Sequence, residues 1–326
     1  MNTLAHVSSG LLLVHLDKMK AVLSGFWLLA LTCLMLPSTS TNAAEDKDSP
    51  LSLSVEAGAE YDDNITVDSS DSNSRRGDTA ILLRSNIGFE AANSKSFKVK
   101  AQYNFSQSLH QDLKDFDLQI HGVSLNMSTK VKGTTIGAGY RYSFIKLGAE
   151  DFLDIHSIKP NIGFLAAKKV YMTADYEYQK QSFKQAFLFS RNSNRHSVSA
   201  KSFFLIGKGK NITLSYKVSR HTTDFPELSY WGHTADLGTK LPVKLGGTDA
   251  TFRARYRYRQ KDYSGVHPSI GDVRGDKRHS FRTSLEIPMF TDFRGKLQYE
   301  FVESNSNLTV VDYQSHVIGF TLRWAI

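Results

Sequence analysis

The chain has 326 residues, 40% hydrophobic and 22% charged, with 40 lysines and arginines against 32 aspartates and glutamates and a formal net charge of +8. The only long apolar run is Ala21 to Leu36, and no later stretch approaches the roughly 20 apolar residues that a membrane-spanning helix needs, so an α-helical membrane protein is excluded. The single cysteine, Cys33, lies inside this run, which excludes a disulfide scaffold or a thiolate metal site in the remainder.

Residues 1–44 have the pattern of a secretory signal peptide. Lys18 and Lys20 precede the apolar run, and the small residues at 41–44 offer a cleavage site. Met19 alone would begin an ordinary signal, so we expect it to be the true start; an uncleaved anchor is the alternative. Cleavage would leave residues 45–50 as a short periplasmic segment before a domain spanning 51–326.

From residue 51 to the end, apolar and polar side chains alternate with period two. The segment 97–105 is an example, in which Lys98, Lys100, Gln102 and Asn104 separate five apolar residues. Such alternation indicates strands with one apolar and one polar face. The runs continue for about 9–11 residues, which is the length that a tilted strand needs to cross a bilayer. The sequence therefore predicts an all-β fold, a transmembrane antiparallel up-and-down β-barrel.

Fourteen strands are expected, within a range of 12–16. Their predicted ranges are 51–62, 79–91, 95–107, 115–128, 133–145, 153–166, 169–181, 194–206, 209–221, 228–241, 248–260, 276–288, 292–304 and 311–326. Short connections alternate with longer ones, of which 63–78, 182–193 and 261–275 are the longest, as expected for periplasmic turns and external loops. An even number of strands returns both termini to the periplasm.

The last predicted strand has the amphipathic, aromatic-bearing form that barrel assembly machinery recognises. Ile318, Phe320, Leu322, Trp324 and Ile326 face one way. The expected partners are therefore this machinery, together with outer-membrane lipid and lipopolysaccharide, in the bacterial outer membrane.

Several motifs resemble one barrel family. The main one is Tyr61, Asp62, Asp63 and Asn64, followed by an acidic, serine-rich loop and Gly-Asp-Thr at 77–79. Weaker likenesses lie at 139–142, 203–205, 256–263 and 304–313. This pattern is similar to the C-terminal barrels of tetratricopeptide-repeat outer-membrane proteins, among them surface lipoprotein assembly modifiers, and to β-barrel porins. The resemblance implies transport, polysaccharide export or surface-lipoprotein delivery. The helical repeats of the larger relatives do not occur in this sequence, so a role that needs them would require a partner.

Four arginines form the most distinctive local feature, Arg253, Arg255, Arg257 and Arg259. Period two places all four on one face along about 20 Å of strand. On the lipid side each would cost about 2–4 kcal/mol at the midplane, so we expect them to face the lumen. Neighbouring strands offer lumenal side chains of matching parity, which are Arg282, Lys240 and the acidic residues Asp236, Glu286 and Glu300.

Two interpretations of this basic ladder stay open. The arginines could guide anions or acidic sugars through a pore. They could instead pair with the acidic residues and fill or stiffen the barrel, which is favoured because narrow barrels often hold lumenal charges of both signs.

Other chemistry is weakly supported. The acidic loop, with Asp62, Asp63, Asn64, Asp68, Asp71 and Asn73, lacks the glycine and glutamate of a calcium loop, so an exposed, solvated loop is expected and no metal site. In His196-Ser197 and His279-Ser280 the neighbouring side chains point to opposite faces of a strand and cannot act together, and Glu150-Asp151 has no obvious partner.

The sequence thus predicts no enzyme and no cofactor. The basic residues are dispersed along strands and not gathered into a patch, which argues against nucleic-acid binding. The leading hypothesis is a porin-like channel for small polar, anionic solutes. The alternatives are an accessory export barrel for polysaccharide or surface lipoprotein, and a structural or adhesive barrel with a closed lumen.

Overall fold

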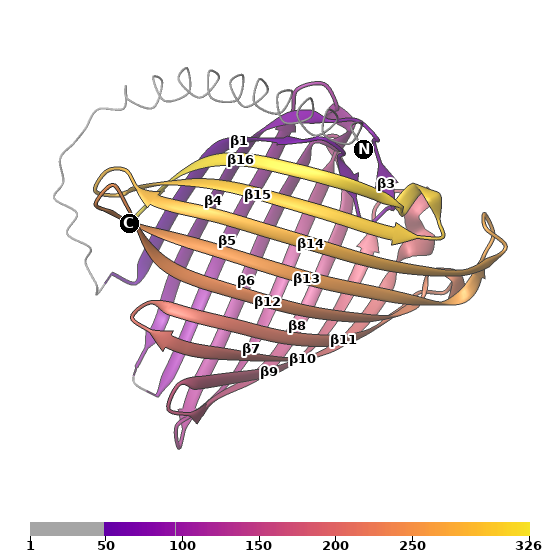
Figure 1. Cartoon of the computed structure of the whole chain (residues 1–326). Coiled ribbons are helices and arrows are strands. Elements are labelled where there is room, and N and C mark those ends of the chain that lie inside the picture. Colours follow the sequence, from indigo (N-terminus) through magenta and orange to yellow (C-terminus); the bar gives the residue numbers. More distant parts are fainter. Residues whose placement is uncertain (1–48, 95) are drawn as a thin grey trace, which may run out of the picture.

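The computed structural model describes residues 49–94 and 96–326, which form a closed antiparallel barrel of fourteen strands (Figure 1). The barrel strands are β1 (Leu51–Asp62), β4 (Asp78–Asn93), β5 (Phe97–His110), β6 (Leu118–Val131), β7 (Thr134–Leu147), β8 (Glu150–Ala167), β9 (Val170–Phe183), β10 (Ser193–Gly207), β11 (Lys210–Thr222), β12 (Tyr230–Leu245), β13 (Thr248–His267), β14 (Asp272–Pro288), β15 (Phe293–Ser306) and β16 (Tyr313–Ala325). Each strand pairs with its neighbours in the barrel sequence, and β1 pairs with β16 to close the ring. The predicted fold class and strand count are confirmed. The predicted signal peptide lies outside the described residues.

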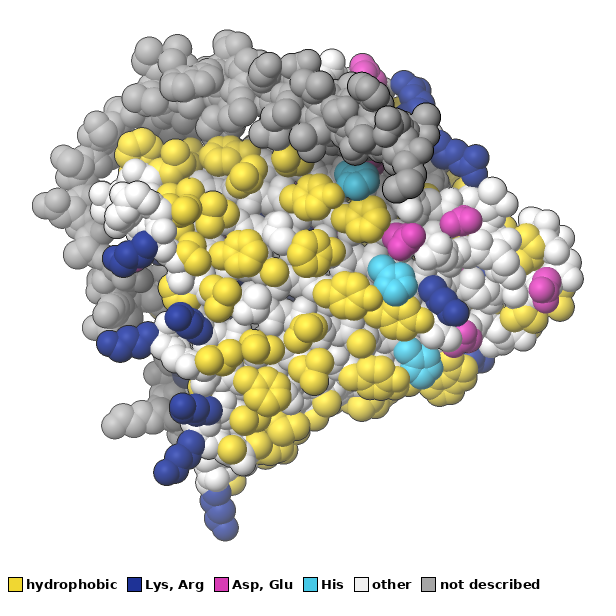
Figure 2. All heavy atoms as spheres, viewed as in Figure 1, with side chains coloured by type: hydrophobic (Ala, Val, Ile, Leu, Met, Phe, Trp, Pro, Cys, Tyr) yellow, Lys and Arg dark blue, Asp and Glu magenta, His cyan; other side chains and the backbone are white. Residues whose placement is uncertain are grey.

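Alternation along each strand separates the two faces of the wall. Val123, Val198 and Leu237 are each more than half exposed on the outer face, where Figure 2 shows a broad band of hydrophobic side chains. In water this band would be an aggregation surface, whereas in a bilayer it is solvated by acyl chains. Among the described residues, no helix is long and apolar enough to span a bilayer.

The two ends of the barrel differ in their connections. At one end, here called the turn end, connections are tight, as at Lys132-Gly133 and Gly246-Gly247, whose positive φ angles suit two-residue hairpins. The opposite end, here called the loop end, carries four short 3-10 helices and a two-stranded hairpin. These are η1 (Lys114–Phe116), η2 (Ala186–Arg191), η3 (Pro226–Leu228), η4 (Thr309–Val311), β2 (Thr66–Val67) and β3 (Ser72–Asn73).

The seam between β1 and β16 depends on a close backbone approach. A Cβ atom added at Gly58 would lie 2.1 Å from the Phe320 carbonyl oxygen. Only glycine fits there without moving the backbone. The seam is therefore tight on its lumenal side, where Gly58 faces inward with Glu56 and Glu60.

Two predicted loops differ from the structure. The segment 261–275 is mostly strand, because β13 and β14 continue their pairing beyond a register shift between Asp262 and Val266. The expected exposed loop at 63–78 is instead folded against the inside of the barrel, and the prediction of a solvated loop is wrong. The contacts that hold it there are part of the candidate site.

Candidate functional site

The four arginines of β13 all lie on the lumenal face. Arg253 donates a hydrogen bond of 2.9 Å to Glu286 on β14, while Arg255 and Arg257 both donate to Asp236 on β12, at 2.6 and 2.8 Å. Three arginines of the basic ladder therefore form ion pairs with acidic residues on the neighbouring strands.

The remaining predicted lumenal residues lie on the same inner wall. Arg282 donates to Glu300 at 3.0 Å, and Arg294, which was not predicted, donates to Glu286 at 3.2 Å. Lys240 lies opposite Arg253 in the register of β12 and β13. The structure thus brings all of these residues to the inner wall, on strands β12 to β15.

An acidic hairpin, residues 65–74 with β2 and β3, is held to the inner wall at the loop end. Asp68 accepts hydrogen bonds from Arg278, at 2.7 Å to Oδ1, and from Arg259, at 3.4 Å to Oδ2. Asp71 accepts two from Arg274, at 2.7 and 3.0 Å, and one from Arg191 at 3.0 Å. Four arginines from β13, β14 and η2 thus fix two carboxylates of this hairpin.

Apolar contacts support the other side of the hairpin. Ile65 is buried, and Val67 packs against a cluster of Phe152, Leu153 and Phe183 with Leu188 of η2. Burying such side chains stabilises the docked position by about 1.5–3 kcal/mol for each fully buried one. The hairpin is therefore anchored both by charge and by packing.

The family-like motif forms the base of the hairpin. Asp62 accepts hydrogen bonds from the Asn64 backbone N–H and the Ser315 hydroxyl, at 2.9 and 2.7 Å. Asp63 accepts one from the His316 N–H at 2.7 Å, and Asn64 donates to the Gln314 carbonyl at 2.9 Å. An added Cβ at Gly77 would lie 2.6 Å from the Tyr61 hydroxyl. These contacts tie the motif to β16, where the chain turns inward.

Arginines occupy the two carboxylates of the acidic hairpin. Among the described residues, no group of three or more histidine, cysteine, aspartate or glutamate side chains could hold a metal ion. Asp68 and Asp71 are occupied by arginines, and these bonds replace the oxygen-rich shell that calcium needs.

Beneath the hairpin lies a lumenal cavity of about 390 Å³. Its basic lining residues are Lys159, Arg191, Arg195, Lys201, Lys217, Arg255, Arg257, Arg259 and Lys261, and its acidic ones are Asp68, Asp71, Asp175 and Asp236. A second cavity of about 390 Å³ follows toward the turn end, with Arg253, Arg282, Arg294 and Arg323 in its wall. Nine basic side chains face four acidic ones in the first cavity, so its surface carries a positive excess.

The positive charge also sets the ionisation of the hairpin. Burial acts to raise the pKa of the Asp71 carboxyl, but the hydrogen bonds and charge of Arg274 and the charge of Arg191 outweigh it and hold that pKa well below its usual value. For Asp68, too, burial acts to raise the pKa, and Arg278 and Arg259 lower it overall. Both groups are more acidic in the docked hairpin than in a released one.

A pH series follows from these shifts. Ionised Asp68 and Asp71 stabilise docking above the ordinary aspartate pKa of about 4, and this stabilisation is lost only as the pH falls through the lowered values. We expect the labelling of the hairpin in hydroxyl-radical footprinting to stay constant from neutral pH to about pH 4 and to rise only in stronger acid, where the hairpin is released. A rise that is complete before the pH reaches the ordinary aspartate range would contradict this assignment.

Sequence reasoning missed several residues of this site. Arg191 and Arg274 lie in predicted loops, so they lacked the period-two pattern that marked the ladder, whereas Arg278 is the third residue of the predicted strand 276–288. The paired nucleophile candidates are separated as expected, because His196 and His279 belong to the outer face while buried Ser197 faces inward.

The structure is similar to solved outer-membrane proteins. A loop-deletion mutant of OmpT from Vibrio cholerae has a TM-score of 0.51 at 8% identity, covering 85% of this chain and 99% of that one. In-vitro folded OmpT in its trimer form has a TM-score of 0.50 at 8% identity, again covering 85% and 99%. An anion-selective porin from Comamonas acidovorans has a TM-score of 0.49 at 9% identity, covering 85% and 98%. The fold is that of an outer-membrane barrel.

No protein-family model and no curated protein matches the sequence. At such low identities the structural likeness concerns the fold alone. The resemblance to barrels of tetratricopeptide-repeat proteins is not confirmed, and it stays a prediction.

Proposed function

We propose that this chain is an outer-membrane channel for small anionic solutes, with its loop end outside the cell and the acidic hairpin restricting passage. The observation that carries this proposal is the excess of basic over acidic side chains around the cavity beneath the hairpin. A positive wall in a narrow polar lumen raises the local concentration of anions and repels cations.

The contacts of the basic ladder are consistent both with structural pairing and with the guidance of anions. Arg253 and Arg294 share the carboxylate of Glu286. Arg255 and Arg257 share the single carboxylate of Asp236, so their combined charge is only half neutralised. Paired arginines stiffen the wall, and the unneutralised charge of Arg255 and Arg257 is available to a passing anion.

Planar-bilayer recording on the purified protein tests this proposal. We expect stepwise conductance with a reversal potential that favours anions across a salt gradient. In the double variant Arg255→Gln with Arg257→Gln, the ratio of anion to cation permeability should fall about fivefold, because removing nearby lumenal charge changes the local energy by roughly 1 kcal/mol.

The matched control is Lys168→Gln, which removes a basic charge from the exposed turn between β8 and β9. It should leave the permeability ratio unchanged. Equal ratios in the wild type and the double variant would remove the ladder from the conduction path. If the barrel conducts neither with the acidic hairpin docked nor with it released, the structural alternative with a closed lumen would be favoured.

A further inference from the structure

A ring of tyrosine–histidine pairs surrounds the outer face of the barrel. In six hairpins a tyrosine hydroxyl lies within hydrogen-bond distance of a histidine Nδ1 on the next strand, at 2.6 to 2.9 Å. The pairs are Tyr103–His121, Tyr140–His156, Tyr176–His196, Tyr216–His233, Tyr256–His279 and Tyr299–His316. Six of the 11 histidines in the chain belong to this ring, here called the Tyr–His belt.

The belt has one depth on the barrel. In β6, β10, β12 and β16 the histidine is the fourth residue of the strand. In β8 and β14 it comes later, because these strands begin farther out. Each tyrosine is diagonal to its histidine across the hairpin. For example, Phe105 lies directly opposite His121, and Tyr103 is the next outward-facing residue from Phe105 toward the turn end. The six hydrogen bonds therefore repeat one geometry around the wall.

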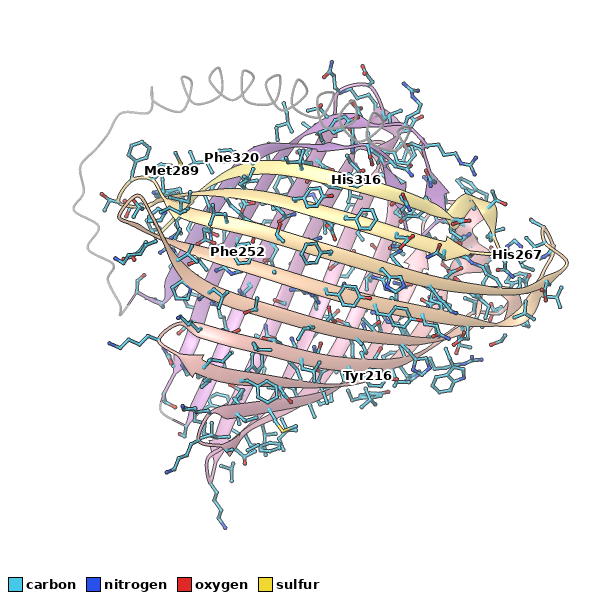
Figure 3. The ribbon with its side chains drawn as sticks, viewed as in Figure 1. Tyr216, Phe252, His267, Met289, His316 and Phe320 are labelled. Atoms are coloured by element: carbon cyan, nitrogen blue, oxygen red, sulfur yellow. The ribbon has the colours of Figure 1, made fainter. Side chains whose placement is uncertain are left out.

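This depth is the upper border of the apolar band. The next outward-facing residues toward the turn end are Val123, Ile158, Val198, Ala235, Phe281 and Ile318. The preceding outward-facing residues are mostly polar, namely Gln119, Asp154, Asn194, Trp231, Lys277 and Gln314. Figure 2 shows histidines at the border between the hydrophobic band and the charged loop end, and Figure 3 marks Tyr216 and His316 on the outer surface. A bilayer that covers the apolar band places its headgroups at this level.

Basic side chains strengthen one sector of the belt. His156 lies opposite Lys180 across β8 and β9, and His196 lies opposite Arg220 across β10 and β11. All four share the outer face on adjacent strands. Three carboxylates share this face: Asp154 borders the sector on β8 and is engaged by Lys184 and Tyr142, Asp262 accepts hydrogen bonds from Gln260, and Glu303 lies opposite His279. The positive sector is thus centred on β9 and β10.

We propose that the Tyr–His belt binds the phosphate groups of lipids in the outer leaflet, most strongly at the sector formed by His156, Lys180, His196 and Arg220. When the tyrosine hydroxyl donates to Nδ1, the neutral imidazole keeps its hydrogen on Nε2 and can donate it to a headgroup. Phosphate oxygens accept such hydrogen bonds, and lysine and arginine add charge-assisted ones. The tyrosines are positioning residues that orient the rings.

The proposal does not depend on channel activity, and lipid retention tests it directly. The full chain is refolded into phosphatidylcholine vesicles that contain either lipid A or lipid A from which the phosphates have been removed. Native mass spectrometry then counts the lipid A molecules retained by each barrel. The wild type should retain phosphorylated lipid A about tenfold better, as expected for the loss of one charge-assisted hydrogen bond. Equal retention of the two lipids would overturn the proposal.

Variants locate the site. Glutamine at all six belt histidines should reduce the retention of phosphorylated lipid A severalfold, whereas His267→Gln, at the loop-end terminus of β13, should not. Heat-modified gel mobility confirms that each barrel is folded. If the sixfold variant does not fold, the double variant Lys180→Gln with Arg220→Gln gives the second measurement. Unchanged retention in a folded variant would exclude the belt as the phosphate site.

Discussion

Replacing Asp68 and Asp71 together by asparagine is expected to raise the single-channel conductance of the reconstituted barrel severalfold. The two carboxylates make the ion pairs between the acidic hairpin and the wall, with Arg191, Arg259, Arg274 and Arg278. Breaking a buried ion pair by removing one partner costs about 3–5 kcal/mol, which shifts a two-state equilibrium by at least about a hundredfold. Docked and released positions of the hairpin are the two states, so released states that are rare in the wild type should become visible.

Planar-bilayer recording again provides the measurement. Asp224→Asn removes a carboxylate from an exposed loop at the same end of the barrel and should leave the conductance unchanged. Asp71 should matter more than Asp68, since its side chain is 9% exposed whereas that of Asp68 is 43% exposed to the lumen. Identical conductance in the double variant and the wild type would show that the hairpin does not control the opening.

The barrel could be predicted from the sequence because its pattern is local. A residue that faces lipid must be apolar, whereas its sequence neighbours face the lumen and can be polar. Each strand therefore has a continuous alternation of apolar and polar residues in the sequence. The prediction failed where that constraint ends. Beyond Asp262 the strands β13 and β14 project past the apolar band, the pairing shifts register, and the alternation no longer marks the strand.

The acidic hairpin could not be predicted because its contacts are distant in sequence. Asp71 binds Arg191 and Arg274, which lie 120 and 203 residues away. Within the segment itself, Ile65 and Val67 are too few apolar residues to indicate packing, and the aspartates are typical of a solvated loop. The burial of this loop depends on a wall that other strands provide.

The Tyr–His belt could be predicted only in part. Histidine followed by a small residue and then an apolar one recurs at His121, His156, His196 and His279. Viewed singly, His196-Ser197 and His279-Ser280 suggest a nucleophile and its base, but their side chains point to opposite faces of the strand. Only the hairpin register, which places each of the six belt histidines diagonal to a tyrosine, shows that the repeat is a ring on the lipid-facing surface.

Arg274→Gln is expected to destabilise the loop end more than any other single change at this site. The Arg274 guanidinium is 1% exposed and lies 4.5 Å from the Tyr263 ring centroid. It donates to Asp71 through Nη1 and Nη2 and to Asp276 through Nε and Nη2, at 2.7 to 3.0 Å. Asp276 also accepts a hydrogen bond from Ser306 at 2.7 Å. One side chain thus joins the hairpin, β14 and β15.

Removing that charge leaves two carboxylates close together without their main partner, so the free energy of unfolding should fall by about 3–5 kcal/mol. The free energy of unfolding of Arg274→Lys should lie between those of the wild type and Arg274→Gln, because lysine keeps the charge but lacks the planar guanidinium fork. Urea unfolding in phosphatidylcholine vesicles, followed by tryptophan fluorescence, measures this, with exposed Arg76→Gln as the control. Combining Arg274→Gln with Asp71→Asn should cost less than the sum of the two, since both break one network. Fully additive losses would show that Asp71 and Arg274 do not stabilise the barrel through each other.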